Sequence, residues 1–319
     1  MDNNIIKVKE LKKYFKTSNG NVHAVDGVNF SIKRGATLGV VGESGCGKST
    51  LGKLLLQLHK ATSGEIIYND RDITKCSGKE LYEVRKSMQM IFQDPSGSLD
   101  PRMSVKDLIG EPLKNYKACK SKAEYEERVA ETMETVGLAP RFKDSFSHEL
   151  DGGRRQRIGV GRALIMRPEF IVCDEPVSAL DVSIQAQVLN LLMDQQEEKN
   201  LTYLFITHDL SVVKHISDEI MVMYLGQCVE YTSKYVLFNN PLHPYTKGLL
   251  AAVPIPSLKA AKLSTEVMRG ELTSPIDPKP GCRFAARCLY AKATCRGNDI
   301  PLVEVEPGHW VACNEYVEK

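Results

Sequence analysis

The sequence predicts an α/β fold built on a parallel sheet. Apolar runs of β-forming residues alternate with amphipathic helical stretches before residue 240, which is the pattern of strand–helix–strand units. A glycine-rich loop at residues 42–50 follows one such strand and precedes a helix, as a phosphate-binding loop does. The composition then changes near Asn240, where prolines and later cysteines become frequent. We therefore expect a P-loop core and a small cysteine-rich C-terminal domain.

Each expected element rests on its own local pattern. The β-rich or wholly apolar runs predict strands at residues 28–32, 36–41, 88–92, 170–176 and 201–208, and short strands around a turn within 63–74. The periodic apolar stretches predict helices at residues 51–58, 183–200 and, with many charges, in much of 104–165. A wholly apolar strand such as 170–176 is typical of a parallel sheet covered on both faces.

Composition excludes several classes of protein. The chain has 319 residues and a formal net charge of +2, and that balance argues against nucleic-acid binding, which usually requires a basic stripe. No apolar run approaches the roughly 18 residues that span a membrane. The N-terminal stretch is polar and lacks the apolar core of a signal peptide, so we expect the protein to stay in the cytoplasm.

The glycine-rich loop fits the pattern G-x-x-x-x-G-K-[ST]. Its backbone N–H groups and the N-terminus of the following helix would bind phosphate oxygens. Lys48 would reach the β- and γ-phosphates, and the Ser49 hydroxyl would bind Mg²⁺. The predicted ATP-binding residues of the loop are Gly42, Ser44, Gly45, Cys46, Gly47, Lys48, Ser49 and Thr50.

Polar residues follow three of the expected strands. Asp174 closes an apolar strand where a Mg²⁺ ligand should lie, and Glu175 follows it directly. A carboxylate in that place can orient and deprotonate an attacking water. Gln93 and His208 also end strands, although neither position alone distinguishes a functional residue from a structural one.

Taken together, these motifs resemble the nucleotide-binding subunit of ABC transporters over nearly the whole chain. The resemblance implies a β subdomain, a helical subdomain of about residues 94–165, ATP and Mg²⁺ as cofactors, and Glu175, His208, Gln93 and Lys48 as catalytic residues. It assigns Mg²⁺ to Ser49, Gln93 and Asp174, and adenine stacking to Phe15, with Tyr14 as the weaker choice. The signature residues Asp151, Gly152, Gly153 and Arg154, together with Asp181 of the D-loop, would contact ATP held by a partner subunit.

The resemblance is closest to F-type ATPase subunits of dipeptide and oligopeptide importers, through "QDPSGSLDPRMSV", "HPYTKGLL", "GELTSPIDPKPGC" and the C-terminal cysteines. It implies a peripheral subunit on the cytoplasmic face of the membrane. Two permease subunits, a second, D-type ATPase subunit and an extracytoplasmic binding protein would be its partners. Related systems import nickel, metallophores or opines, so the cargo stays open. A soluble, non-transport ABC ATPase is a further alternative, but this chain has a single cassette and no heptad run.

The signature departs from the family pattern. Where the family has serine and glutamine, this chain has Asp151 and Arg154. An ionised aspartate cannot donate to a phosphate, and two charges about 4 Å apart repel by roughly 4 kcal/mol at an effective dielectric near 20. Asp151 is either a helix N-cap, with Arg154 three residues on to neutralise it, or the cause of a weakened composite site. Arg154 is also able to take over the phosphate contact.

Four cysteines crowd the last 38 residues: Cys282, Cys288, Cys295 and Cys313. Their spacings are wider than the ligand pairs of structural zinc sites, which favours a bulkier iron–sulfur cluster. Arg283, Arg287 and Arg296 each adjoin a cysteine, and nearby cations favour thiolates. The family resemblance likewise implies a [4Fe–4S] cluster, with zinc or unligated cysteines as alternatives and His309 as a bystander. We place the domains at residues 1–239 and 240–319.

Overall fold

The computed structural model describes residues 3–252 and 274–317. These residues form two compact units. Unit 1 contains residues 33–36 and 76–205, and unit 2 contains the described residues of 2–32, 37–75 and 206–319. The stretch "GELT", which carried part of the family resemblance, lies outside the described residues.

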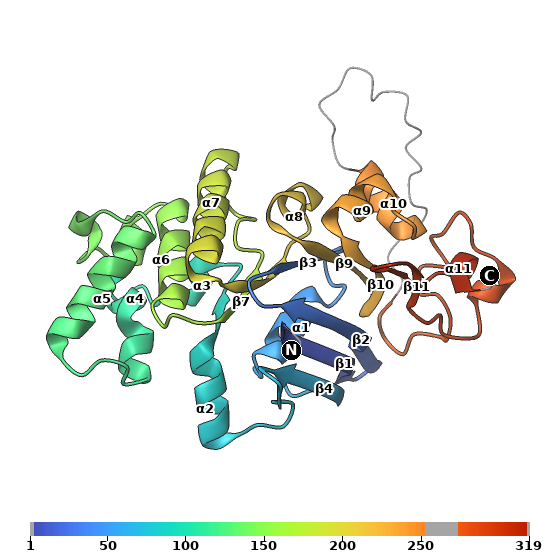
Figure 1. The fold of residues 1–319 in the computed structure, drawn as a ribbon, viewed down its shortest axis with the longest axis horizontal. Helices are drawn as coiled ribbons and strands as arrows, with labels where there is room; N and C mark the ends of the chain where they lie inside the picture. The colour runs from blue at the N-terminus through green and yellow to red at the C-terminus, as the bar shows by residue number, and fades with distance from the viewer. Residues whose placement is uncertain (1–2, 253–273, 318–319) are drawn as a thin grey trace, which may run out of the picture. The chain divides into compact units, whose positions relative to one another are not determined.

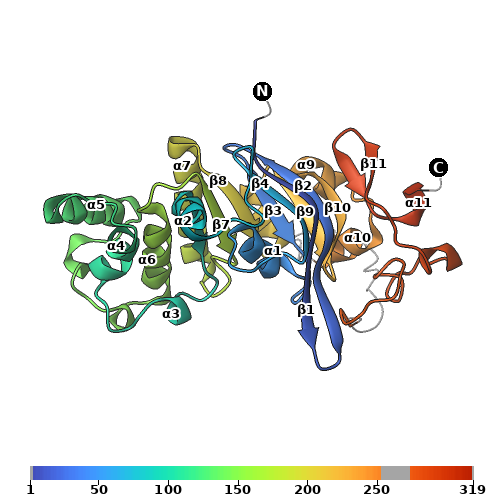
Figure 2. The same cartoon turned by 90° about the horizontal axis from the view of Figure 1, so that it is seen from below.

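An antiparallel sheet of four strands forms the N-terminal part of unit 2, in the order β2-β1-β4-β5. Its strands are β1 (Asn4–Thr17), β2 (Gly20–Lys33), β4 (Ser63–Tyr68) and β5 (Arg71–Asp72). The long arms of β1 and β2 run side by side in Figure 2. The sequence reading predicted only the end of β2 and missed β1, whose buried and partly exposed residues alternate irregularly across a register shift between Lys9 and Lys12.

The rest of unit 2 is built on β3 (Thr37–Val41), whose five residues are all buried, and β9 (Glu219–Tyr224), which pairs with it in parallel. β10 (Gln227–Ser233), β12 (His309–Val311) and β11 (Val303–Glu306) continue the sheet as antiparallel strands (Figure 1). The helices of this unit are α1 (Lys48–Leu55), α8 (Leu210–Ile216), α9 (Lys234–Asn239), α10 (Pro244–Ala251) and α11 (Asn314–Val317).

A buried carboxylate ties this sheet to the C-terminal strands. Glu230 on β10 has no exposed surface, and it accepts hydrogen bonds from the backbone N–H groups of Leu242 and His243 at 2.8 and 2.9 Å. Nε2 of His309 on β12 lies 2.8 Å from Oε1 of Glu230, the same oxygen that accepts from Leu242. Burial alone would raise the pKa of Glu230, but these hydrogen bonds outweigh it and lower the pKa. His309 is thus bound to a buried carboxylate, and its place as a bystander to the cysteines stays a prediction.

Unit 1 contains three neighbouring strands and a set of helices. β6 (Met88–Ile91) pairs in parallel with β7 (Phe170–Asp174), and β8 (Thr202–Ile206) follows β7 in the sheet order. The helices are α2 (Gly78–Ser87), α3 (Pro95–Ser98), α4 (Val105–Asn115), α5 (Lys122–Thr135), α6 (Gly152–Leu164) and α7 (Val182–Lys199), with short 3-10 turns at Pro140–Phe142 and Ser147–Glu149. α4, α5 and α6 group together in Figures 1 and 2.

The predicted α/β class with parallel strands is confirmed, but a separate cysteine-rich C-terminal domain is not supported. Residues 274–317 belong to the same compact unit as residues 3–32. Their backbone also pairs with it: the N–H of His23 donates to the carbonyl of Pro275 at 3.0 Å, and Val22 bridges to Ile276. The boundary near Asn240 therefore stays a prediction from composition.

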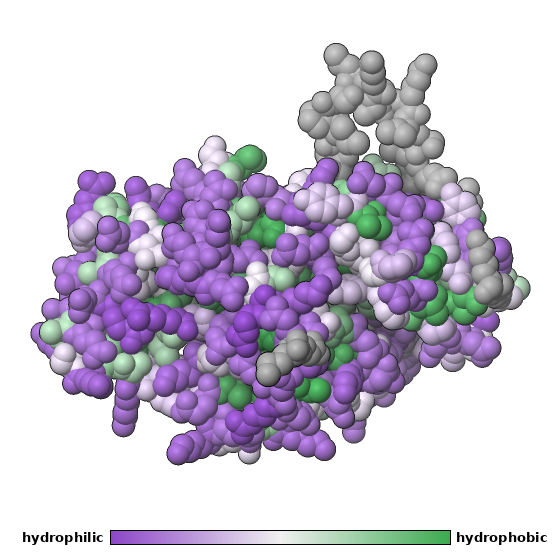
Figure 3. All heavy atoms as spheres, in the orientation of Figure 1, coloured by the Kyte–Doolittle hydropathy of each residue, from purple (hydrophilic) through white to green (hydrophobic). Residues whose placement is uncertain are grey.

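The surface in Figure 3 is mostly hydrophilic, with small separate apolar areas. Among residues 3–252 and 274–317, the helices are all too short or too polar to cross a bilayer. The most buried elements are the central strands, since every residue of β3, β7 and β8 is buried.

Candidate nucleotide site

The phosphate loop lies between β3 and α1 in unit 2, as the sequence predicts. Gly47 ends the loop with a φ of 105°, and a Cβ there would stand 1.9 Å from the carbonyl oxygen of Ala24. Only glycine fits that combination of backbone angle and close approach. Because the residue at the start of α1 has no side chain, it leaves the first N–H groups of the helix to another acceptor. This geometry suits a bound anion.

Lys48 is buried, and its Nζ donates to the carbonyl oxygens of Gly42 and Glu43 at 2.6 and 3.0 Å. The ammonium group therefore sits within the curve of the loop. Cys46 is also buried, and burial raises the pKa of its thiol, so it stays neutral at ordinary pH. Cys46 acts as a packing residue here, while Ser44 and Gly45 are exposed and Ser49 and Thr50 are half-buried.

His208 follows β8 and is exposed, within unit 2. The next residue, Asp209, caps α8, since its carboxylate accepts from the N–H of Ser211 at 2.8 Å. This cap fixes the chain direction directly after His208. The catalytic role predicted for His208 stays a proposal.

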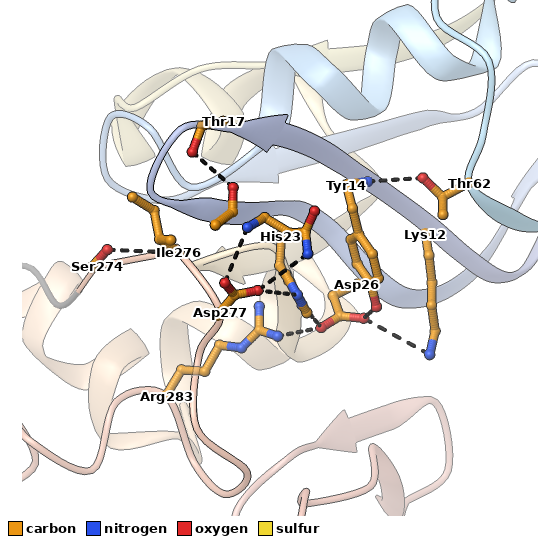
Figure 4. Close-up of polar contacts among 12 residues, drawn as sticks. Lys12, Tyr14, Thr17, His23, Asp26, Thr62, Ser274, Ile276, Asp277 and Arg283 are labelled. Carbon is orange, nitrogen blue, oxygen red and sulfur yellow. Dashed lines mark hydrogen bonds and ion pairs between the residues drawn. The ribbon is translucent and has the colours of Figure 1, made fainter.

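The two aromatic candidates for adenine stacking, on β1, differ in their surroundings. The Tyr14 ring stacks on His23 with centroids 3.9 Å apart, and its hydroxyl donates to Asp26 (Figure 4). Phe15 is half-buried and meets His59 edge to face at 5.5 Å. Tyr14 is therefore committed to an internal network, and Phe15 is the better candidate for a planar ligand.

Asp26 is the centre of that network. Figure 4 shows Tyr14, His23, Lys12 and Arg283 converging on its carboxylate. Burial alone would raise the pKa of Asp26, but the hydrogen bonds of Tyr14 and His23 and the charge of Arg283 lower it. The carboxylate is thus held ionised. It joins Arg283, in the C-terminal segment of residues 274–317, to β1, the strand that carries Phe15.

The catalytic candidates of unit 1 meet where β6 and β7 end. The Nε2 group of Gln93 donates to Oε2 of Glu175 at 3.1 Å. Glu175 has a φ of 46°, an uncommon value for a residue with a side chain. Asp174, the last residue of β7, is 5% exposed. The sequence placed these three residues at strand ends, and the structure shows that two of them touch.

Asp151 caps α6, as the sequence predicts. Its Oδ1 accepts from the backbone N–H of Arg154 at 2.8 Å, and the Arg154 guanidinium also pairs with its Oδ2. The same guanidinium lies over the ring of Phe142, 4.8 Å from its centroid. The predicted cap is therefore confirmed, and a contact with a partner's nucleotide stays a prediction.

Gly152, Gly153 and Asp181 complete the predicted contacts with a partner's nucleotide. A Cβ on Gly152 would come only within 3.8 Å of Leu180, whereas one on Gly153 would come within 2.7 Å of Ile184. Asp181 caps α7, and its carboxylate accepts from the N–H groups of Ser183 and Ile184 at 3.1 and 3.0 Å. Asp181 therefore has a structural role within this chain.

The four C-terminal cysteines line one cavity of about 250 Å³, with Tyr290 and Glu315 among its other walls. Within residues 3–252 and 274–317, no three His, Cys, Asp or Glu side chains cluster closely enough to hold a metal ion. Burial raises the pKa of Cys282 to about 11 and also raises those of Cys288 and Cys313. An iron–sulfur or zinc site is thus not confirmed.

We expected the neighbouring arginines to favour thiolates. Two of these arginines, Arg283 and Arg287, bind other groups instead. Arg283 bonds to the carbonyl oxygen of Leu225 and to Asp26, and Arg287 bonds to Glu43 at 2.7 and 3.0 Å. Both guanidinium groups therefore bind residues outside the cysteine cluster, and that of Arg287 binds the phosphate loop.

Two residues hold the phosphate loop from outside, a role that the sequence analysis predicted for neither. The hydroxyl of Tyr245 accepts from the N–H of Glu43 at 2.8 Å, while Arg287 grips the Glu43 carboxylate. Tyr245 lies in the stretch "HPYTKGLL", which the sequence reading used only for family resemblance. The family-like pattern of this stretch was the one sequence signal that pointed to Tyr245. No sequence signal pointed to the contact of Arg287 with the loop.

Comparison with known families agrees with this geometry. The model of the family described as "ABC transporter" matches residues 25–178, and the one described as "Oligopeptide/dipeptide transporter, C-terminal region" matches residues 229–295. The first match contains the phosphate loop, the signature and the Gln93–Glu175 pair. The second contains Tyr245, Arg287 and three of the four cysteines.

Curated relatives are similar over nearly their whole length. The chain is 50% identical to the oligopeptide transport ATP-binding protein AppF of Bacillus subtilis (strain 168), covering 98% of this chain and 97% of the relative. It is 49% identical to OppF of Haemophilus influenzae, covering 96% and 93%. For OppF of Escherichia coli (strain K12) the identity is 48%, covering 96% and 92%.

Solved structures are similar over the cassette. The dimeric ATP-binding cassette MJ0796 bound to ADP and Pi superposes with a TM-score of 0.67 at 28% identity, covering 72% of this chain and 98% of that one. The structure of cbiO1 from Clostridium perfringens, part of the ABC transporter complex cbiONQ, gives a TM-score of 0.67 at 30% identity, covering 75% and 92%. The chain therefore belongs to the ATP-hydrolysing, ATP-binding subunits of ABC transporters, in the group that carries the oligopeptide/dipeptide transporter C-terminal region.

Proposed function

We propose that this chain hydrolyses ATP to drive the uptake of di- and oligopeptides through a membrane permease. The observation that carries the proposal is the identity of about half of all residues, over nearly the full length, with proteins named oligopeptide transport ATP-binding proteins. Binding of a panel of peptides, nickel chelates and opines to the extracytoplasmic protein encoded beside this chain would identify the cargo. Tight binding of a nickel chelate and of no peptide would replace the peptide assignment.

In this proposal the phosphate loop binds the triphosphate, with Lys48 against the β- and γ-phosphates and Phe15 against the adenine. Its support is the open N-terminus of α1 and the ammonium group lying within the loop. Lys48→Ala should weaken MgATP binding roughly tenfold or more, because it removes a charge-assisted hydrogen bond. Lys53→Ala, one turn along α1, is the matched control. Equal affinity of Lys48→Ala and wild type, measured by calorimetry, would contradict this role.

Ser49, Gln93 and Asp174 are the proposed ligands of Mg²⁺. Hydroxyl, amide and carboxylate oxygens suit this hard cation. In Gln93 the Nε2 group donates to Glu175, so the amide oxygen would be the atom that binds the ion. The ion would neutralise charge on the phosphates. Glu175 would accept a proton from the attacking water, and the hydrogen bond from Gln93 would orient Glu175. His208 would contact the γ-phosphate.

We propose that the helical part of unit 1 contacts a permease, which makes the chain a peripheral subunit on the cytoplasmic face of the membrane. A groove of about 830 Å³ supports this; its lining includes Lys106, Lys114, Lys117, Lys122 and Lys143, which outnumber the acidic lining residues Asp107 and Glu126. Such a groove would suit a helix carrying acidic residues. Lys117→Glu should reduce recovery of the permease with this chain, and Lys60→Glu, in unit 2, serves as the control.

The second ATPase subunit is proposed to be a different, D-type chain. The signature of this chain would then face the partner's ATP, and the partner's signature would face the ATP bound here. Purified alone, this chain should have feeble ATPase activity that rises when the partner and permeases are added. Robust, cooperative activity of this chain alone would argue for a homodimer.

We further propose that Cys282, Cys288, Cys295 and Cys313 hold a [4Fe–4S] cluster, which would tie four points of the C-terminal segment together. What supports this is that the four thiols line one cavity, since the ligands of a cluster bind separate irons. Anaerobically purified protein should be brown and contain about four irons per chain. Colourless protein with one zinc would overturn the proposal, and Cys288→Ser should lose the metal.

A further inference from the structure

The phosphate loop contains one carboxylate, that of Glu43. It is the only acidic residue among residues 42–50, directly after the first glycine of the motif. A bound triphosphate brings several negative charges to the same loop, and like charges within a few ångströms repel strongly where water is partly excluded. Left uncompensated, Glu43 would oppose the ligand that the loop is built to bind.

Arg287 compensates this charge. Its two terminal nitrogens donate to the two oxygens of Glu43 at 2.7 and 3.0 Å, the parallel arrangement in which arginine binds a carboxylate most strongly. The Arg287 side chain is 9% exposed. The hydrogen bond with Glu43 raises the pKa of Arg287, so the guanidinium is always charged.

Packing fixes the direction of that guanidinium. It lies over the rings of Tyr224 and Phe284, 5.9 and 5.8 Å from their centroids. Those two rings and that of Tyr245 pack against one another at 4.7 to 5.4 Å. Since the hydroxyl of Tyr245 also accepts the Glu43 N–H, one aromatic cluster supports both contacts that reach this residue of the loop.

We propose that Arg287 is a positioning residue for ATP: it neutralises Glu43 and so lets the phosphate loop accept the triphosphate. The proposal rests on the proposed function in one respect, namely that the loop binds ATP. The C-terminal segment thereby takes part in nucleotide binding through a side chain that belongs to none of the cassette motifs.

Calorimetry of MgATP binding to the full chain tests this directly. Arg287→Gln should bind about tenfold more weakly than wild type, because it leaves the negative charge of Glu43 without its partner on the loop that receives the phosphates. Adding Glu43→Gln to it should restore the affinity to within about twofold. The defect of the single variant should also shrink as salt is raised, because ions screen the repulsion.

Two further variants guard against a defect of folding. Arg287→Lys keeps the charge but not the paired hydrogen bonds, so its affinity should lie between those of wild type and Arg287→Gln. Arg34→Gln breaks an ion pair of similar length, between Arg34 and Glu169 at 2.6 Å, in unit 1. It should leave the affinity unchanged. Thermal unfolding without nucleotide reports the stability of each variant.

The outcomes separate the two proposals. Wild-type affinity in Arg287→Gln, or a double variant as weak as the single one, would overturn the role of Arg287 while leaving ATP binding intact. Failure of the wild-type chain to bind MgATP would instead overturn the proposed function of the loop.

Discussion

The phosphate loop and the signature loop both place a carboxylate beside glycines, and both neutralise it with an arginine. In the signature the partner of Asp151 is Arg154, three residues away. In the phosphate loop the partner of Glu43 is Arg287, 244 residues away in sequence. The local pair follows from helix geometry and could be predicted, whereas the remote pair could be seen only once the chain was folded.

The two loops also begin their helices differently. α1 begins after Gly47, which offers no side chain to its N–H groups, while the carboxylate of Asp151 already accepts an N–H group at the start of α6. The phosphate loop therefore leaves its donors to a ligand, and the signature satisfies one of its donors internally. We therefore expect the phosphate loop to bind an anion more tightly than the signature loop does.

The largest expected effect comes from Glu175, which lies in neither loop. Glu175→Gln should lower ATP turnover by about 10²- to 10⁴-fold, as loss of a general base does, and should leave MgATP binding close to wild type. Turnover of the assembled complex and calorimetry of the chain measure the two effects. The control is Glu169→Gln in the same unit. Retention of wild-type turnover by Glu175→Gln would show that another group activates the water.

A matched pair of glycines compares the loops directly. Gly47→Ala should weaken MgATP binding by about tenfold or more, because a Cβ there meets the carbonyl oxygen of Ala24 at 1.9 Å on a left-handed backbone. Gly152→Ala has room within its own chain, so its melting temperature and MgATP affinity should stay unchanged. Any loss of ATPase in the complex with Gly152→Ala would then report a nucleotide held by the partner. A destabilised Gly152→Ala would refute this distinction.

Variants of Asp151 should have smaller effects. Asp151→Ala removes the cap and should cost about 1 kcal/mol, lowering the melting temperature by roughly 2–4 °C. Asp151→Ser keeps a cap, and because Arg154 already neutralises the carboxylate, ATPase in the complex should change by less than about threefold. Arg154→Gln should lower that activity by leaving the charge unpaired. A tenfold rise with Asp151→Ser would favour the weakened-site reading instead.

Acid should destabilise the start of α10, where Tyr245 contacts the phosphate loop. Burial lowers the pKa of His243, whose Nδ1 caps α10 next to Tyr245, to about 4. Between roughly pH 6.5 and 4 the unfolded chain binds a proton that the folded chain does not, so stability falls as the pH is lowered, by up to about 3 kcal/mol. His243→Asn keeps a cap and should flatten this slope in melting experiments. The exposed His215→Asn should not, and equal slopes for the two variants would contradict the assignment.

Sequence reasoning succeeded where the deciding contacts are local. The strand–loop–helix around Lys48, the strand ending at Asp174 and the cap by Asp151 each depend on a few neighbouring residues. It missed β1, whose burial pattern alternates irregularly across a register shift, and it assigned the charge of Arg287 to the cysteines, whereas this side chain pairs with Glu43. Pairing between distant segments depends on tertiary packing, which one sequence does not display.

The link between Glu230 and His309 has a consequence for how the protein is made. The two residues are 79 positions apart, and a ribosome adding about 5–20 residues per second needs roughly 4–16 seconds to cover that interval. Until β12 emerges, β10 is an open sheet edge, and the carboxylate at its centre lacks the histidine that later encloses it. During this interval of synthesis, every catalytic motif of the nascent chain has been made. The strand β12, which pairs with β10, has not.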